Sequence, residues 1–162
     1  ARMRRQHSGE SVGGAHPGAS QPIIGWAAAG GTWDAMESWY LFALLFLWQL
    51  PHFVAINWLC REQYEEAGYK MWSNGDVSGK KTARLALIYS AMLAMLAPLA
   101  SLPGIGMAGW AFGVGGFLAG GYMCKLSIDF GRIGDRRSSR QLFFFTLLYL
   151  PFALALLTFS WN

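Results

Sequence analysis

Long apolar runs separated by short charged segments dominate this chain. The strongest run extends from Trp39 to Cys60 and contains no Asp, Glu, Lys or Arg. At about 1.5 Å of rise per helical residue, a run of this length crosses a hydrocarbon layer of roughly 30 Å. The pattern therefore predicts a membrane-spanning α-helix at residues 39–60.

Four further stretches repeat this pattern, so the predicted fold is an all-α, polytopic transmembrane helical bundle. The predicted spans are residues 12–31, 39–60, 82–101, 107–126 and 142–161. The first is the weakest, because it is rich in Gly and Ala and is interrupted by Pro17 and Pro22. Small residues of this kind suit close helix packing, as does the Gly116 to Gly120 pair in the fourth span.

Four residues interrupt the apolar character of the strongest span: Gln49, Pro51, His52 and Asn57. Pro51 removes a backbone donor, which predicts a kink near residues 47–49. Polar groups at this depth must find partners inside the protein. They either join helices or form a ligand site, and their clustering just before a carboxylate-rich segment favours a site.

The basic residues give a topology. The chain carries 13 Lys and Arg against 9 Asp and Glu, and every Lys and Arg falls within residues 1–10, 61–84 or 125–140. With five spans these segments lie on one side, which the positive-inside rule assigns to the cytoplasm or the mitochondrial matrix. The net charge of +4 thus reflects membrane orientation and predicts no nucleic-acid partner. A hydrophobic content of 54% also excludes an ordinary soluble domain.

The segment after the strongest span is rich in carboxylates. Glu62, Glu65 and Glu66 lie at helical spacings that let Glu62 share a face with one of the others. A solvated amphipathic segment is the simpler interpretation of these charges. Cys60 and Cys124 have no metal-binding spacing and are expected to be small, partly buried residues.

Several short sequence motifs, taken in the order in which they occur along the chain, resemble those of the haem O synthases. These enzymes are also called protohaem IX farnesyltransferases and are UbiA-type intramembrane prenyltransferases. The motifs are Arg4-Arg5, Val12-Gly-Gly-Ala15, Pro22-Ile-Ile-Gly-Trp26, Trp48-Gln-Leu-Pro-His-Phe53, Arg61-Glu-Gln-Tyr64, Ala67-Gly-Tyr-Lys-Met71 and Ser78-Gly-Lys-Lys-Thr-Ala83. The resemblance covers essentially the whole chain but only the C-terminal part of the family's length. It implies one prenyltransferase domain over residues 1–162, part of a nine-span bundle.

The resemblance also implies an activity. Farnesyl diphosphate ionises, the allylic cation alkylates a vinyl group of haem B, and water completes the side chain of haem O, a step toward haem A for cytochrome c oxidase. The implied partners are haem B, farnesyl diphosphate, the lipid bilayer and the downstream haem A synthase, with Mg²⁺ as cofactor. The implied location is the mitochondrial inner membrane, with the bacterial plasma membrane as the alternative.

Combining the resemblance with the chemistry of the residues gives a candidate site. The catalytic candidates are His52, Arg61 and Tyr64; the substrate-binding candidates are Gln49, His52, Asn57, Arg61, Lys80, Lys81 and Arg84; the metal-binding candidates are Glu62, Glu65 and Glu66. The chain departs from the family at Gln63, where an Asp is typical. The family's first acid-rich motif lies upstream of these residues, so the 162 residues alone are not expected to catalyse the reaction.

Two other functions remain open. A related prenyltransferase acting on another ring acceptor shares the scaffold. A non-enzymatic haem-binding membrane subunit also places histidines in spans, but it normally needs a pair at membrane depth. Only His52 lies in a strong span here, since His7 precedes the spans and His16 lies in the weak one.

Overall fold

The computed structural model describes residues 15–161 apart from Trp33, Lys70 and Trp72, and for residues 15–19 it describes the backbone alone. The helices of this part are α2 (Ala15–Ala28), α3 (Met36–Leu59), α4 (Arg61–Glu66), α5 (Lys80–Ala100), α6 (Trp110–Ile133) and α7 (Arg136–Phe159). No strand is present in the described residues, so the predicted all-α class is confirmed.

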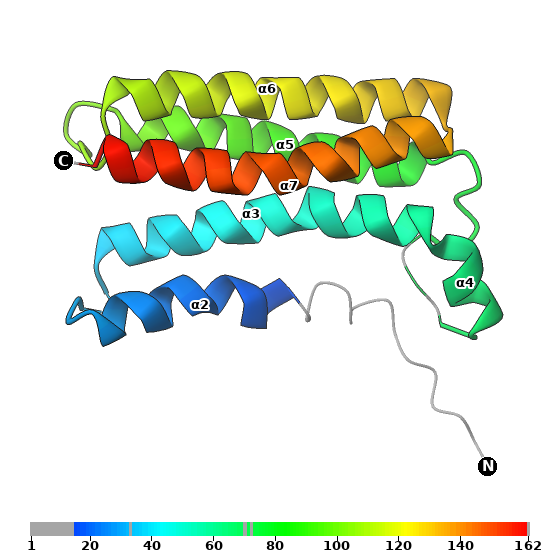
Figure 1. Ribbon diagram of the computed structural model, residues 1–162, viewed down its shortest axis with the longest axis horizontal. Helices are drawn as coiled ribbons and strands as arrows, with labels where there is room; N and C mark the ends of the chain where they lie inside the picture. Colours follow the sequence, from blue (N-terminus) through cyan, green and yellow to red (C-terminus); the bar gives the residue numbers. More distant parts are fainter. Residues whose placement is uncertain (1–14, 33, 70, 72, 162) are drawn as a thin grey trace, which may run out of the picture.

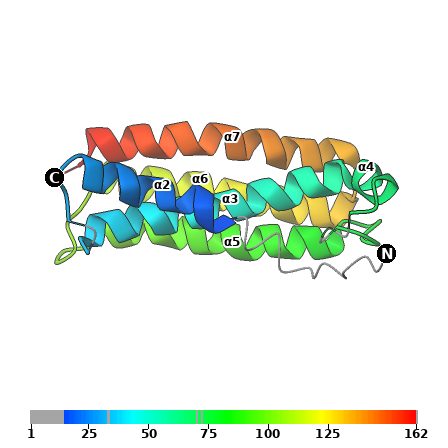
Figure 2. The same cartoon turned by 90° about the horizontal axis from the view of Figure 1, so that it is seen from below.

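Four long helices run side by side as a bundle (Figures 1 and 2). Helix α5 packs against α3 and α6, and α7 packs against the same two helices. Within the described residues, these four helices are long and apolar enough to cross a membrane. They correspond to the predicted spans 39–60, 82–101, 107–126 and 142–161, and the chain is an integral membrane protein.

The predicted first span is represented by the shorter helix α2. This helix has 14 residues, includes Pro22 and packs against α3. Its length is only about 21 Å at 1.5 Å per residue, and Figure 1 shows it alongside part of α3. Residues 12–14 lie outside the described part of the chain, so a membrane crossing at 12–31 stays a prediction. His16 and Pro17 fall within this helix.

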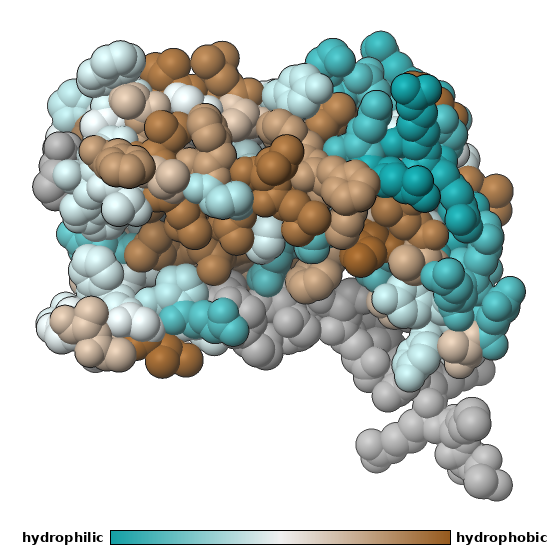
Figure 3. Space-filling model, in the orientation of Figure 1, coloured by the Kyte–Doolittle hydropathy of each residue, from teal (hydrophilic) through white to brown (hydrophobic). Residues whose placement is uncertain are grey.

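Two basic segments lie at the same end of the bundle, as the charge pattern predicts. The connection through α4 joins α3 to α5, and a short turn at Gly134 and Asp135 joins α6 to α7 at that end (Figure 1). Hydrophilic residues gather there in Figure 3. We call it the basic end. The third segment, residues 1–10 with His7, lies outside the described residues.

Close packing of α5 against α6 depends on small residues. A Cβ atom added at Gly116 would lie 2.5 Å from the Cβ of Ala97, and one added at Gly120 would lie 2.6 Å from the Cα of Ala94. Neither position has room for a side chain, which confirms the predicted close contact of the Gly116 to Gly120 pair.

Candidate functional site

His52 lies on α3 where that helix faces α7. Its imidazole stacks on the ring of Trp48, at a centroid distance of 5.3 Å, and on the ring of Phe143, at 4.9 Å. Its Nδ1 atom lies 2.9 Å from the Oγ1 atom of Thr146. Helix α3 continues through Pro51 to Leu59; the kink predicted there stays a prediction.

The hydrogen bonds of Thr146 determine which imidazole nitrogen carries the proton. The Thr146 hydroxyl donates its only hydrogen to the carbonyl oxygen of Phe143, at 2.6 Å. Toward His52 the same oxygen can therefore only accept, so Nδ1 of His52 is the protonated nitrogen that donates. In the neutral imidazole this leaves the lone pair of Nε2 free to accept a hydrogen bond or ligate a metal.

Contacts between α3 and α7 join these two helices, which the simpler interpretation of the sequence predicts for His52. The indole Nε1 of Trp48 donates to the carbonyl oxygen of Thr146 at 2.6 Å, and the hydroxyl of Ser139 donates to the carbonyl oxygen of Ala55 at 3.3 Å. Gln49 and Asn57 are only 6% and 7% exposed. Through Nδ1, His52 joins α3 to α7, and its place in a ligand site stays a prediction.

At the basic end, Glu62 is held between two arginines. Arg61 Nη2 lies 3.1 Å from Glu62 Oε1, and Arg136 Nη2 lies 2.8 Å from Glu62 Oε2. The guanidinium of Arg61 also lies 4.2 Å from the centroid of the Trp58 ring and donates to the Trp58 carbonyl oxygen. Both carboxylate oxygens of Glu62 are therefore engaged, Oε1 within α4 and Oε2 with Arg136 at the start of α7.

The other two candidate metal ligands are exposed. Glu65 accepts a hydrogen bond from the backbone N–H of Gly75 at 3.2 Å, which connects α4 to the following turn. In the part of the chain that is described, no three His, Cys, Asp or Glu side chains lie close enough together to hold a metal ion. Mg²⁺ commonly uses one or two carboxylates plus substrate phosphates. As neighbours in α4, Glu65 and Glu66 point to different sides of that helix, so either carboxylate alone could act in this mode; metal binding by them stays a prediction.

Asp76, which the sequence places in a turn, is a buried carboxylate at 4% exposure. Its Oδ2 atom accepts hydrogen bonds from the backbone N–H and the hydroxyl of Thr82, both at 2.9 Å, and its carbonyl oxygen accepts from Trp58 Nε1 at 2.8 Å. Asp76 therefore connects the beginning of α5 to the end of α3. The sequence analysis did not identify this role. The available signal was the position of Asp76, six residues before Thr82, where a predicted span begins.

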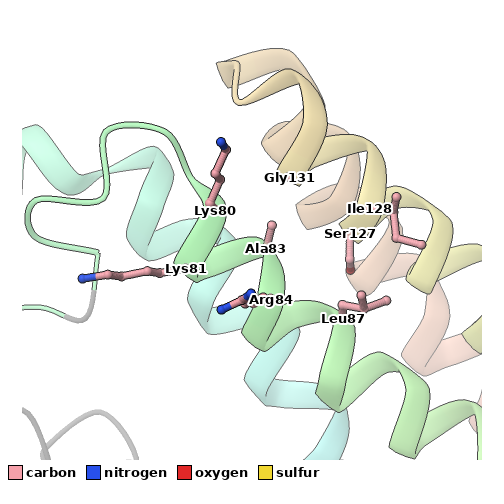
Figure 4. A pocket seen from close by; sticks show the side chains of 8 residues that line it. All are labelled: Lys80, Lys81, Ala83, Arg84, Leu87, Ser127, Ile128 and Gly131. Carbon is pink, nitrogen blue, oxygen red and sulfur yellow. The ribbon is translucent and has the colours of Figure 1, made fainter.

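Lys80, Lys81 and Arg84 project from the first turns of α5 and line a cavity of about 450 Å³ between α5 and α6 (Figure 4). The other lining residues are Ala83, Leu87, Ser127, Ile128 and Gly131. The three cations therefore lie around one cavity, and their substrate-binding role stays a prediction. Their cavity includes neither His52, whose contacts lie toward α7, nor any of the candidate glutamates.

The remaining candidates are Tyr64 and the two cysteines. The Tyr64 ring lies edge-on to the ring of Tyr69, with centroids 6.4 Å apart, and Tyr64 is half-buried. Cys60 and Cys124 are free and partly buried, as expected.

Comparisons with known proteins show which sequences this chain resembles. The chain is 37% identical over 150 residues to a protoheme IX farnesyltransferase of Solibacter usitatus, covering 92% of this chain and 50% of the relative. It is 38% identical over 144 residues to the mitochondrial protoheme IX farnesyltransferase of Homo sapiens, covering 89% of this chain and 31% of the relative. A protoheme IX farnesyltransferase of Opitutus terrae is 37% identical over 145 residues, with 89% and 48% covered.

The chain thus spans half or less of the length of these relatives. No solved structure matches it. The sequence model of the UbiA prenyltransferase family matches residues 1–159, nearly the entire chain. This chain therefore belongs to the UbiA prenyltransferase family.

Proposed function

We propose that the protein to which these residues belong transfers the farnesyl group of farnesyl diphosphate to a vinyl group of haem B and so forms haem O. The observation that carries this proposal is the identity of 37–38% to protoheme IX farnesyltransferases over most of the chain. The arrangement of His52, with one nitrogen fixed and the other free inside a span, supports an acceptor that binds at membrane depth.

In the proposed reaction the bond between the allylic carbon and the diphosphate oxygen breaks, and the diphosphate keeps the electron pair. The vinyl group of the acceptor forms a new carbon–carbon bond to the allylic carbon. Water then adds to the resulting cation and a proton is released, which gives the hydroxyethylfarnesyl side chain. No net oxidation or reduction takes place.

The residues of this chain divide into two groups in this proposal. His52, with the buried Gln49 and Asn57 on the same helix, binds and orients the haem acceptor in the membrane. Arg61 and Tyr64 lie at the basic end, where Arg61 neutralises the leaving diphosphate. Glu65 or Glu66 would hold Mg²⁺ together with phosphate oxygens, and Glu62 positions Arg61 and Arg136. When bound, the divalent cation would supply positive charge to the leaving diphosphate.

The relatives support two possible compartments. Mitochondrial and bacterial protoheme IX farnesyltransferases both resemble the chain, so the inner mitochondrial membrane and a bacterial plasma membrane are both consistent with it. The haem A synthase that would take the product is the proposed downstream partner. The diphosphate role predicted for Lys80, Lys81 and Arg84 stays a prediction; among the described residues, no Asp or Glu lines their cavity.

The proposal is tested by giving the intact purified protein haem B, farnesyl diphosphate and Mg²⁺ and measuring the extracted haem by mass spectrometry. We expect the mass of haem O from the wild type and none from His52→Ala. Thr146→Val should lower the yield, because it removes the acceptor for His52 Nδ1, whereas Thr158→Val on the exposed face of α7 should not.

The other outcomes point to the alternative functions. Full activity of His52→Ala would remove His52 from the site. Haem that stays bound but unmodified in the wild type would indicate a non-enzymatic haem-binding subunit. Prenylation of a different ring acceptor, with haem B left unchanged, would indicate a related transferase.

A further inference from the structure

Asp76 is a buried carboxylate in the turn before α5, and the proposed reaction gives it no role. The residue is 4% exposed, and its Oδ2 atom accepts hydrogen bonds from the backbone N–H and the hydroxyl of Thr82, each at 2.9 Å. Hydrogen bonds to a charged group are stronger than those between neutral groups, and a buried carboxylate depends on them. The carboxylate therefore fixes the first turn of α5 relative to the turn that precedes it.

The same turn also holds the end of α3. The carbonyl oxygen of Asp76 accepts a hydrogen bond from Trp58 Nε1 at 2.8 Å, and the hydroxyl of Ser73 donates to the carbonyl oxygen of Asn57 at 3.1 Å. Gly79 lies directly against the indole, because a Cβ added there would lie 3.3 Å from Cε2 of Trp58. The turn is thus both hydrogen-bonded to the last residues of α3 and packed against them.

Trp58 in its turn holds Arg61, the residue proposed to neutralise the leaving diphosphate. The guanidinium carbon lies 4.2 Å from the centroid of the Trp58 ring, and Nη1 donates to the Trp58 carbonyl oxygen at 3.1 Å. The face of an indole ring attracts a guanidinium, so the position of the indole determines where this cation lies. The other cations predicted to bind the diphosphate project from the first turns of α5: Lys80, Lys81 and Arg84 (Figure 4).

We propose that Asp76 is a positioning residue for the donor diphosphate. Its carboxylate fixes the start of α5 and its carbonyl oxygen fixes Trp58, so this one residue sets the spacing between Arg61 and the cations of α5. The inference rests on the proposed farnesyl transfer, because it needs a diphosphate that both groups of cations contact. Asp76 acts through its neighbours and not as a metal ligand, since it is buried and its Oδ2 atom already accepts two hydrogen bonds.

The test measures the affinity of the intact purified protein for farnesyl diphosphate with Mg²⁺ by titration calorimetry. Asp76→Asn keeps the shape of the side chain and removes its charge, whereas Thr82→Val keeps the size and removes the hydroxyl donor. We expect the Kd to rise by at least about tenfold in Asp76→Asn and by about threefold in Thr82→Val. Thr82→Ser retains the hydroxyl and should keep the wild-type Kd. In the product assay the KM for farnesyl diphosphate should rise in the same order, while the KM for haem B stays unchanged.

The control for a general loss of stability is Gly120→Ala, whose added Cβ would lie 2.6 Å from the Cα of Ala94. This contact is about 21 Å along α5 from Lys80, so the Kd should stay at the wild-type value. If Asp76→Asn and Thr82→Val lower the unfolding free energy but keep the wild-type Kd and KM, Asp76 is only structural and the proposal is overturned. If Asp76→Asn raises the Mg²⁺ concentration needed for half-maximal binding and Thr82→Val changes nothing, Asp76 is a metal ligand and the proposal is wrong.

The calorimetric measurement also separates a failure of this inference from a failure of the proposed function, because it needs no product. If the wild type binds farnesyl diphosphate but forms no haem O, the proposed acceptor is wrong, and the Kd values of the variants still decide the role of Asp76. If the wild type forms haem O and no variant changes the Kd or the KM, only the role of Asp76 is wrong. If the wild type does not bind farnesyl diphosphate, both proposals fail.

Discussion

Replacement of Gly120 by alanine gives a direct measure of how tightly α5 and α6 pack. The added Cβ would lie 2.6 Å from the Cα and 3.0 Å from the backbone nitrogen of Ala94. Contact at an ordinary distance begins at 3.4 Å, so the helices must separate locally by 0.8 Å or more. Because the contacted atoms are backbone, no rotamer change relieves the overlap.

The adjacent Gly121→Ala is the matched control. It makes the same chemical change one residue along the same helix, and nothing lies within 4 Å of the added Cβ. Both variants gain the helical preference of alanine over glycine, about 0.5–1 kcal/mol. The difference between the two therefore isolates the overlap with Ala94, for which overpacking typically costs about 1–3 kcal/mol.

The measurement is the free energy of unfolding of the intact protein in mixed micelles of dodecyl maltoside and SDS, followed by tryptophan fluorescence. We expect Gly121→Ala to be at least as stable as the wild type and Gly120→Ala to be about 1–3 kcal/mol less stable than Gly121→Ala. If Gly120→Ala proves as stable as Gly121→Ala, the close approach of α5 and α6 at this level is refuted.

Three further predictions concern the basic end. Asp76→Ala should lower the unfolding free energy by roughly 1–3 kcal/mol in the same assay, because two buried donors at the start of α5 lose their acceptor. Two hydrogen bonds hold the pKa of the Asp135 carboxyl below its ordinary value of 3.8: the larger effect comes from the Ser138 hydroxyl and the smaller from the Ser138 backbone N–H. Folding thus favours the charged carboxylate. The stability that this carboxylate contributes is present above pH 3.8 and is lost as the pH falls below that value. Asp135→Asn should therefore flatten the acid side of a plot of unfolding free energy against pH. Gly134→Ala should destabilise more than Gly75→Ala, since both have a positive φ (67° and 75°) but only Gly134 would place a Cβ against a backbone carbonyl oxygen, at 2.7 Å.

The existence of the membrane helices could be predicted from sequence, whereas their ends could not. Hydropathy predicts a span at 107–126, but α6 continues to Ile133. The continuation carries an exposed ion pair between Lys125 and Asp129, one helical turn apart. Apolar residues mark the hydrocarbon layer, while the helix ends where Gly134 adopts a left-handed conformation and Asp135 accepts the N–H of Ser138.

The candidate site could be predicted only as far as its residues lie close in sequence. His52 was identifiable as a lone imidazole in a strong span. Its partner Thr146 was not, because it lies 94 positions away and a threonine within an apolar helix gives no local signal. In the same way, helical spacing predicted that Glu62 could share a face with Glu65 or Glu66, but the contact of Glu62 with Arg136 depends on how α7 packs.

Helix α7 relates the two parts of the candidate site to each other. Arg136 contacts Glu62 at the basic end, and Thr146 contacts His52 ten residues further along the same helix. At 1.5 Å per residue these contacts lie about 15 Å apart along the axis. In the reaction that we propose, the new carbon–carbon bond forms next to the leaving diphosphate, so an acceptor bound at His52 would have to extend much of this distance toward the basic end. A large planar macrocycle would meet that requirement better than a single small ring, so the proposal predicts a tetrapyrrole acceptor.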